Sequence, residues 1–240
     1  MASLNEILKT NTVRVPKPLV IVDNPSGGAA LAMEYVKMRP LVKHAAQVKH
    51  AAQLGELLAN MHLDNERKWH QSQSSSIHDS KEDCVEKFGF HISCGYLPLE
   101  NAWHSDWVEF FCRQRIDTQI KKAQEKYGDR EAGQLWGLLE RSVPSLFAGL
   151  KPIQPALLHG DLWGGNVAET EDGAIIYDPA AFYGHAEFDL SIAKLFGGFE
   201  DSFYKAYFKC IPKADGFEKR LQLYQLFHYL NHWNHFGGGY

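Results

Sequence analysis

The sequence lacks the features that define several classes of protein. It has only 4 cysteines in 240 residues, at irregular intervals, which argues against a disulfide framework and a cysteine zinc site. No apolar run approaches the ~20 residues that a membrane span needs, and no basic segment followed by an apolar one predicts a signal peptide. With 25 Lys and Arg against 29 Asp and Glu, the net charge of −4 argues against nucleic acid as a partner. We therefore expect a cytoplasmic protein that binds neither membrane nor nucleic acid.

What is present is ordinary globular composition, with 45% hydrophobic and 22% charged residues. The length suits one large domain or two small ones. Two apolar runs, 19–22 and 29–33, flank a turn-rich segment at 23–28 and predict a β-hairpin. Such a hairpin is too small to be stable alone, so its sheet partners must be missing or lie elsewhere in the chain.

Most of the remaining chain has helical patterning. A hexapeptide at 42–47 recurs at 48–53, which is a local copy and not a repeat architecture. The polar segment 64–87 predicts a loop, and 113–150 predicts two helices. Further helices are expected to end at Gly197 and to cover 220–236. The fold class is therefore α/β, with β structure first and mainly helices after it.

A second predicted hairpin brings together groups suited to phosphoryl transfer. A turn centred near Asp172 would bring Asn166 and Asp178 side by side, and Asp161 lies five residues before Asn166. Amide and carboxylate oxygens suit Mg²⁺, so Asn166 and Asp178 are candidate metal ligands beside the phosphates of ATP. Asp161 can accept a proton from an attacking hydroxyl, since Asp-x₄-Asn followed by Asp is the kinase pattern. The alternative is a turn-rich loop with capping Asp and Asn residues.

Three stretches of the chain resemble the fructosamine kinase family, and within it the ketosamine-3-kinases. They read LLHGDLWGGNVA from 157, YDPAAFYGHAEFDLSIAKLFGGF from 177 and LYQLFHYLNHWNHFG from 223. The resemblance implies a protein-kinase-like fold of the aminoglycoside phosphotransferase branch. It also implies ATP-dependent phosphorylation of the 3-hydroxyl of ketosamines (ribulosamine, psicosamine or fructosamine adducts) on glycated amines or proteins, leading to deglycation. In the family motif, Asp161 is the catalytic base, and Asn166 and Asp178 hold Mg²⁺.

The same resemblance implies a hinge between two lobes. Backbone groups of Glu34, Tyr35 and Val36 would bind the adenine of ATP, although a plain strand end is the alternative. Residues 1–36 would then be a remnant of the small N-lobe with the hinge, and 37–240 a C-lobe with the catalytic loop and the acceptor subdomain. Family members carry more chain before the position of Met1, including a glycine-rich loop and a phosphate-pairing Lys. We therefore expect a truncated N-lobe and weak or absent activity.

The final helix is the candidate wall of an acceptor pocket. From Leu221 to Phe236 it has no charged residue, and His228, His232 and His235 share one face. These histidines either donate hydrogen bonds to sugar hydroxyls or are satisfied core residues. The i, i+4 spacing of His228 and His232 also suits a helical zinc site, but no third ligand lies nearby in sequence.

Five further residues receive smaller roles. Trp163 either stacks on the acceptor sugar or packs in the core. His159 is expected to brace the catalytic loop, and His62 to lie at a helix end. Glu187 and Asp189 are expected to complement a helix dipole.

Three functions remain open at this point. The first is a ketosamine-3-kinase using Mg²⁺ and ATP. The second is a non-catalytic, pseudokinase-like binding protein that keeps the acceptor pocket. The third is a histidine-based metal hydrolase.

Overall fold

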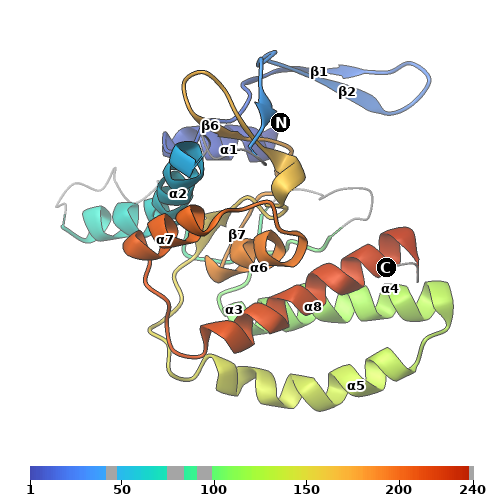
Figure 1. The fold of residues 1–240 in the computed structure, drawn as a ribbon. Helices are drawn as coiled ribbons and strands as arrows, with labels where there is room; N and C mark the ends of the chain where they lie inside the picture. Colours follow the sequence, from blue (N-terminus) through green and yellow to red (C-terminus); the bar gives the residue numbers. More distant parts are fainter. Residues whose placement is uncertain (42–47, 75–83, 91–98, 238–240) are drawn as a thin grey trace.

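A computed structural model describes residues 1–41, 48–74, 84–90 and 99–237. Helices form most of this part of the chain, together with three small antiparallel sheets (Figure 1). The α-helices are α1 (Ala2–Thr10), α2 (Val48–Ser74), α3 (Trp107–Phe110), α4 (Thr118–Tyr127), α5 (Glu131–Leu139), α6 (Glu187–Phe196), α7 (Asp201–Cys210) and α8 (Phe217–Phe236). Shorter turns are the π-helical η3 (Phe111–Asp117) and the 3₁₀ turns η4 (Glu140–Leu146) and η5 (Gly164–Asn166). The strands are β1 (Pro18–Asp23), β2 (Ala29–Met33), β3 (Arg39–Pro40), β4 (Ala156–Leu158), β5 (Val167–Glu169), β6 (Ala174–Ile176) and β7 (Phe182–Gly184).

The first predicted hairpin is confirmed as β1 and β2, which form a sheet of their own. It projects from the body of the molecule (Figure 1). The side chains of Leu19, Val20, Ile21 and Val22 are all exposed, and β1 and β2 form a two-stranded sheet in the described residues.

The second predicted hairpin is confirmed as β5 and β6, joined to β3 in a three-stranded sheet. Its register differs by one residue from the prediction, since Val167 pairs with Ile176. A two-residue turn, Glu171–Asp172, closes the hairpin, with the Thr170 N–H donating to the Gly173 carbonyl at 2.8 Å. Asn166 therefore lies opposite Tyr177, and Asp178 follows one position later.

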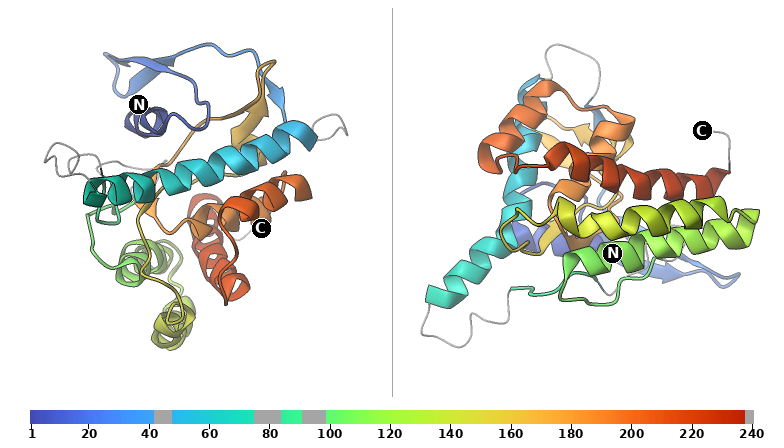
Figure 2. Two further views of the ribbon diagram at one scale, coloured as in Figure 1. Left: turned by 90° about the vertical axis from the view of Figure 1, so that its left-hand side faces the viewer. Right: turned by 90° about the horizontal axis from the view of Figure 1, so that it is seen from below.

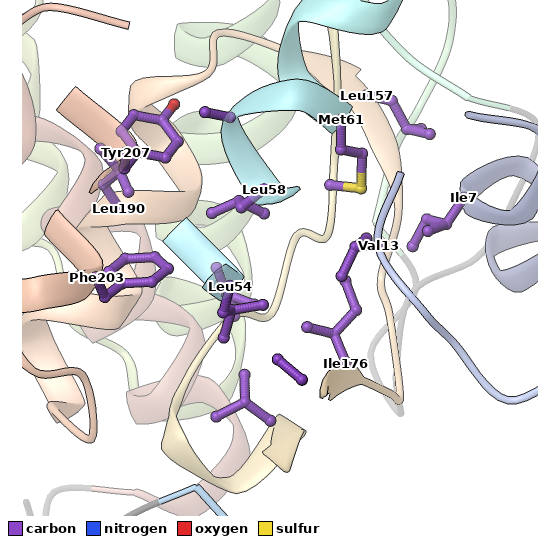
Figure 3. Packing of buried hydrophobic residues seen from close by; sticks show 14 of the residues in the cluster. Ile7, Val13, Leu54, Leu58, Met61, Leu157, Ile176, Leu190, Phe203 and Tyr207 are labelled. Carbon is purple, nitrogen blue, oxygen red and sulfur yellow. The ribbon is translucent and has the colours of Figure 1, made fainter. Parts of the chain in front are cut away.

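Helix α2 forms the centre of the larger hydrophobic core. Leu54, Leu58 and Met61 on its inner face are fully buried. They pack between α7 on one side and the sheet and α1 on the other (Figure 3). Gly55 allows α2 to approach α7 closely, because a Cβ there would lie 2.2 Å from the Phe203 carbonyl oxygen.

The loop predicted over 64–87 is wrong for its first part, because α2 continues to Ser74. Lys68 and Asp64 pair across one helical turn at 2.8 Å, which supports a polar helix face. The buried Asn65 side chain bonds both the N–H and the carbonyl of Val85. Residues 75–83 and the first hexapeptide copy, 42–47, lie outside the described residues.

The C-terminal part is a layer of helices in which α8 lies beside α4, with α5 outside them (Figures 1 and 2). Tyr127 stacks on Trp233 with ring centroids 5.3 Å apart, and the buried Asn234 amide donates to the Gln119 side chain at 2.7 Å. The predicted last helix and the stop at Gly197 are confirmed. Helices of the described chain are all too short or too polar to span a bilayer.

Candidate active site

The loop between β4 and β5 carries Asp161 and Asn166. The Asn166 Nδ2 donates to the Asp161 Oδ2 at 2.9 Å and to the Asp161 carbonyl at 2.8 Å. Gly160 has φ of 81°, and a Cβ there would lie 2.1 Å from the Ala180 carbonyl oxygen. Only glycine therefore fits this turn, which places the two side chains together as the sequence predicts.

Asp178 follows β6 in a backbone conformation that non-glycine residues seldom adopt, with φ of 54°. It faces the same cavity as Asp161. Its carboxylate makes no hydrogen bond or ion pair with the part of the chain that the structure describes. Strained backbone of this kind concentrates at functional sites, so the geometry favours a ligand-binding role for this carboxylate.

His159 braces the loop, as expected. Its ring is fully buried, the Nε2–H donates to the Tyr177 carbonyl at 3.0 Å, and Nδ1 accepts from the Asp161 N–H at 3.2 Å. Both bonds need a neutral imidazole. Burial lowers the pKa of His159, which keeps the ring neutral.

Asp189 holds the same loop from α6. Its carboxylate is fully buried and accepts hydrogen bonds from the backbone N–H groups of His159 at 2.7 Å and Gly160 at 2.8 Å. It also contacts His62 Nε2 at 3.1 Å, and His62 Nδ1 contacts the Tyr207 hydroxyl at 2.8 Å. Burial opposes ionisation of Asp189, but the hydrogen bond and charge of His62 outweigh it, so the pKa is lowered.

The smaller role expected for His62 is wrong, and those expected for Glu187 and Asp189 are incomplete, because both residues lie in the first turn of α6 but also have specific partners. His62 lies within α2 and not at a helix end. Asp189 binds the catalytic loop instead of only complementing a dipole. Glu187 forms a buried, bidentate pair with Arg220 at 2.7 and 2.8 Å. These partners are distant in sequence, which is why local pattern could not reveal them.

The pKa of Asp161 is raised. Burial is the main cause, opposed by the nearby His159 and by the hydrogen bond from Asn166. The charge of Asp178 raises the pKa further. A raised pKa makes the ionised carboxylate a better proton acceptor.

A cavity of about 450 Å³ opens beside this loop. It is lined by residues of the catalytic loop, the segment after β6, and helices α6 and α8: Leu99, Gly160, Asp161, Trp163, Asp178, Pro179, Ala180, Ile192, Phe196, Phe227, His228, Asn231, His232, His235 and Phe236. The structure thus brings the predicted acceptor residues to one cavity with Asp161, the predicted base, and Asp178, one of the two predicted metal ligands. Trp163 is 42% exposed.

The three histidines differ in their surroundings. His228 is buried, and its Nε2 has no hydrogen-bond partner in the described structure. Burial lowers its pKa to about 3, so this ring is neutral at neutral pH. His232 and His235 each place Nδ1 on the carbonyl one turn earlier, at 3.0 and 2.7 Å. A neutral ring that donates from Nδ1 keeps Nε2 as an acceptor.

The predicted hinge residues lie away from this cavity. Tyr35 and Val36 line a second cavity of about 440 Å³, beside the β5–β6 turn. Glu34 lines neither cavity: its Oε2 accepts from the Lys17 N–H at 3.2 Å, and its Oε1 lies 3.5 Å from Arg14 Nη2. Glu34, Tyr35 and Val36 are therefore not among the lining residues of the cavity that holds Asp161.

Trp107 and Asp106, which follow the described residues 99–105, do not line this cavity. Trp107 is buried and donates to the Tyr224 hydroxyl at 2.9 Å, and Asp106 caps α3. Leu99 and Phe196 line the cavity instead. A His-based metal site also finds no support, since no group of three His, Cys, Asp or Glu side chains suited to a metal occurs in the described ranges.

Comparison with known proteins gives the family. The model of the fructosamine kinase family matches residues 1–240. The chain belongs to the fructosamine kinase family. Ketosamine-3-kinase of Mus musculus is 54% identical over 100% of this chain and 78% of its own length. The chloroplastic protein-ribulosamine 3-kinase of Arabidopsis thaliana is 38% identical, over 99% of this chain and 66% of its own length.

Solved structures confirm the expected protein-kinase-like fold. A Thermobifida fusca protein described as a fructosamine-3-kinase superposes with a TM-score of 0.75 at 30% identity, covering 99% of this chain and 74% of its own. The aminoglycoside 2′-phosphotransferase-IIIa, in its GDP complex, gives a TM-score of 0.54 at 12% identity, covering 98% and 76%. The second likeness concerns the fold alone.

Proposed function

We propose that this fructosamine kinase family member transfers the γ-phosphoryl group of ATP to the 3-hydroxyl of ketosamines on glycated amines or proteins. The observation that carries the proposal is that Asp161, Asp178 and the three histidines of α8 line one cavity. The similarity to ketosamine-3-kinase and protein-ribulosamine 3-kinase supports the acceptor class. The product would lead to deglycation.

Asp161 is the proposed catalytic base. The 3-hydroxyl oxygen forms a bond to the γ-phosphorus, the bond to the β-phosphate oxygen breaks, and Asp161 takes the hydroxyl proton. Asn166 and His159 hold this carboxylate and its backbone in place. The proposed role therefore needs no movement of the loop.

Asn166 and Asp178 are the proposed Mg²⁺ ligands. The Asn166 amide uses Nδ2 for Asp161, and its Oδ1 makes no hydrogen bond to the described chain. Asp178 likewise has an unpaired carboxylate. One amide and one carboxylate oxygen fit the protein's share of a magnesium site, in which phosphates and water supply other ligands. Bound Mg²⁺ would offset the negative charge of the phosphates.

The remaining roles are proposed from the family resemblance and from the lining of the Asp161 cavity. Backbone groups of Glu34, Tyr35 and Val36 are proposed to bind adenine, with residues 1–36 as an N-lobe remnant and 37–240 as the C-lobe. His228, with its unpartnered Nε2, is proposed to hydrogen-bond the acceptor sugar together with His232 and His235. The irregular cysteines support action in the cytoplasm.

A non-catalytic binding protein has no specific observation in its favour. Both the base and the metal-binding positions keep the residues that the reaction needs, and Asp161 is already hydrogen-bonded to Asn166. A binding protein has no requirement for either feature.

The test is a kinase assay with a ribulosamine or fructosamine adduct, following ADP release and locating the phosphate by NMR. Asp161→Asn should lower kcat by a factor on the order of 10² or more, with little change in ATP affinity. The matched control is Asp23→Asn, an exposed residue of the projecting hairpin. Undiminished turnover in Asp161→Asn would refute the role of the base, and phosphate on another oxygen would refute the reaction.

A further inference from the structure

The fixed charge of the Asp161 cavity has one sign. Two carboxylates, Asp161 and Asp178, line it, and none of its described lining residues is Lys or Arg. The His228 ring adds no compensating positive charge at neutral pH, because burial keeps it neutral. A cation entering this cavity therefore meets attraction and no repulsion from lysine or arginine.

The mouth of the cavity is formed by aromatic rings that the core does not cover. Trp163, Phe196 and Phe236 are 42%, 39% and 64% exposed. Trp163 and Phe196 have ring centroids 6.5 Å apart, and His232 lies between Phe196 at 4.5 Å and Phe236 at 5.6 Å. We call Trp163, Phe196 and Phe236 the aromatic mouth.

Trp163 is fixed close to the catalytic loop. A Cβ on Gly165 would lie 2.3 Å from the indole ring, so the ring rests directly on the loop backbone. The aromatic mouth is thus tied to the loop that carries Asp161, two residues earlier. A group that sits a few bonds from the reacting hydroxyl will come close to this ring.

We propose that the aromatic mouth binds the protonated amine of the acceptor, so that the enzyme selects the positively charged adduct over a neutral ketose of the same shape. This inference rests on the proposed function. In a ketosamine the amine nitrogen lies four bonds from the 3-hydroxyl oxygen, and it is protonated at neutral pH. The face of an aromatic ring attracts a cation within about 6 Å of its centre.

Stacking on the sugar alone makes a different prediction. The apolar face of a sugar packs on an indole whether or not the neighbouring atom is charged. A neutral analogue with the same hydroxyl groups would then bind as well as the amine. Charge on the acceptor separates the two explanations.

The experiment measures binding by calorimetry and phosphorylation in parallel, with three ligands. They are a morpholine ketosamine, its permanently charged N-methyl salt, and a neutral analogue with cyclohexyl in place of morpholine. The charged pair should bind about tenfold more tightly than the neutral analogue at neutral pH. As pH rises above the pKa of the morpholine amine, its affinity should fall toward the neutral value, while the N-methyl salt keeps its affinity.

Variants locate the effect. Trp163→Leu and Phe236→Leu should each weaken the charged ligands about fivefold and leave the neutral analogue unchanged, while Trp163→Phe keeps most of the preference. Tyr229→Leu is the matched control, because Tyr229 is 58% exposed on α8 and does not line the cavity.

The inference would be overturned if all three ligands bound equally well or if none of them bound. It would also be overturned if Trp163→Leu weakened the binding of all three ligands equally. Because binding is measured separately, a charge preference without phosphate transfer would refute the proposed function and leave this inference standing.

Discussion

His62 and Asp189 meet in the interior of the protein, with Nε2 and Oδ2 3.1 Å apart, although they are 127 positions apart in sequence. The Asp189 carboxylate also accepts the N–H groups of His159 and Gly160. A fully buried carboxylate is costly unless such partners satisfy it. The position of the catalytic loop therefore depends on helices α2 and α6 as well as on the strands beside it.

Asp189→Asn should destabilise the protein by about 2–4 kcal/mol, because an amide cannot accept all of these hydrogen bonds. It should also lower kcat more than it changes KM, since the loop loses its anchor. Urea unfolding and steady-state kinetics measure the two effects. Asp201→Asn, in the first turn of α7, is the control. If Asp189→Asn were as stable as the parent protein, the claim that Asp189 anchors this loop would be wrong.

Because of the same carboxylate, we expect the stability of the protein to depend on pH in the acid range. Its pKa is lowered in the folded protein from an ordinary value of 3.8. Its contribution is therefore fully present above pH 3.8 and is lost as pH falls from 3.8 through the folded pKa. Urea unfolding between pH 5 and 3 should show a smaller acid loss in Asp189→Asn than in the parent protein. If the stability of the parent protein and that of Asp189→Asn fell equally with pH, the link between Asp189 and acid stability would be refuted.

His228 predicts a loss of the same sign at milder pH. Its folded pKa is about 3 against an ordinary value of 6.5, so below pH 6.5 the unfolded chain binds a proton that the folded chain does not. This histidine should cost up to about 1.4 kcal/mol of stability per pH unit as pH falls from 6.5 toward 3. His228→Gln should flatten that decline in urea unfolding. His185 has a pKa that burial also lowers to about 3, so it should still lower stability in acid in the His228→Gln variant.

Gly160→Ala should place a methyl group against the Ala180 carbonyl in a backbone conformation that alanine disfavours. We expect a loss of about 1–3 kcal/mol in stability and a larger loss in kcat than in ATP affinity. Gly137→Ala is a suitable control, since a Cβ at that position in α5 meets nothing within 4 Å. Full activity in Gly160→Ala would show that the loop can shift.

We expect copies of the protein to associate through the projecting hairpin. Leu19, Val20, Ile21 and Val22 are exposed on a strand that has no described strand along its outer edge, which is a typical aggregation hazard. Replacing Val20 and Val22 with Lys should raise the concentration at which light scattering appears and leave the midpoint of urea unfolding nearly unchanged. Unaltered scattering would show that another surface causes association.

The local parts of the site were predictable from sequence. The glycine-rich turn and the kinase-like spacing place Asp161, Asn166 and Asp178 near one another, and the uncharged stretch of α8 indicates a helix with a polar face on a cavity. The register of the β5–β6 hairpin was missed by one residue because the turn contains two residues instead of three. Helix α1 was not predicted, although Leu4 and Ile7 fill the core.

The long-range contacts were not predictable in the same way. Nothing near Asp189 in sequence points to His62, and the family resemblance, although it covers 177–199, implied no role for Asp189. One signal was available. His62 follows Leu58 by four residues, on the buried face of a helix, and a polar side chain there needs a partner. That argument gives a need for a partner but not its identity.

The bond between Asp189 and the backbone of His159 and Gly160 makes the catalytic loop part of the same cooperative unit as the helical core. The loop cannot open by itself, because opening would leave a buried anion without its donors. Proteins usually draw their mobile catalytic segments from the least stable parts of the structure. Here the loop that carries Asp161 lacks that freedom, and a substitution in α2 or α6 that removes one of these hydrogen-bond partners is expected to lower turnover and stability together.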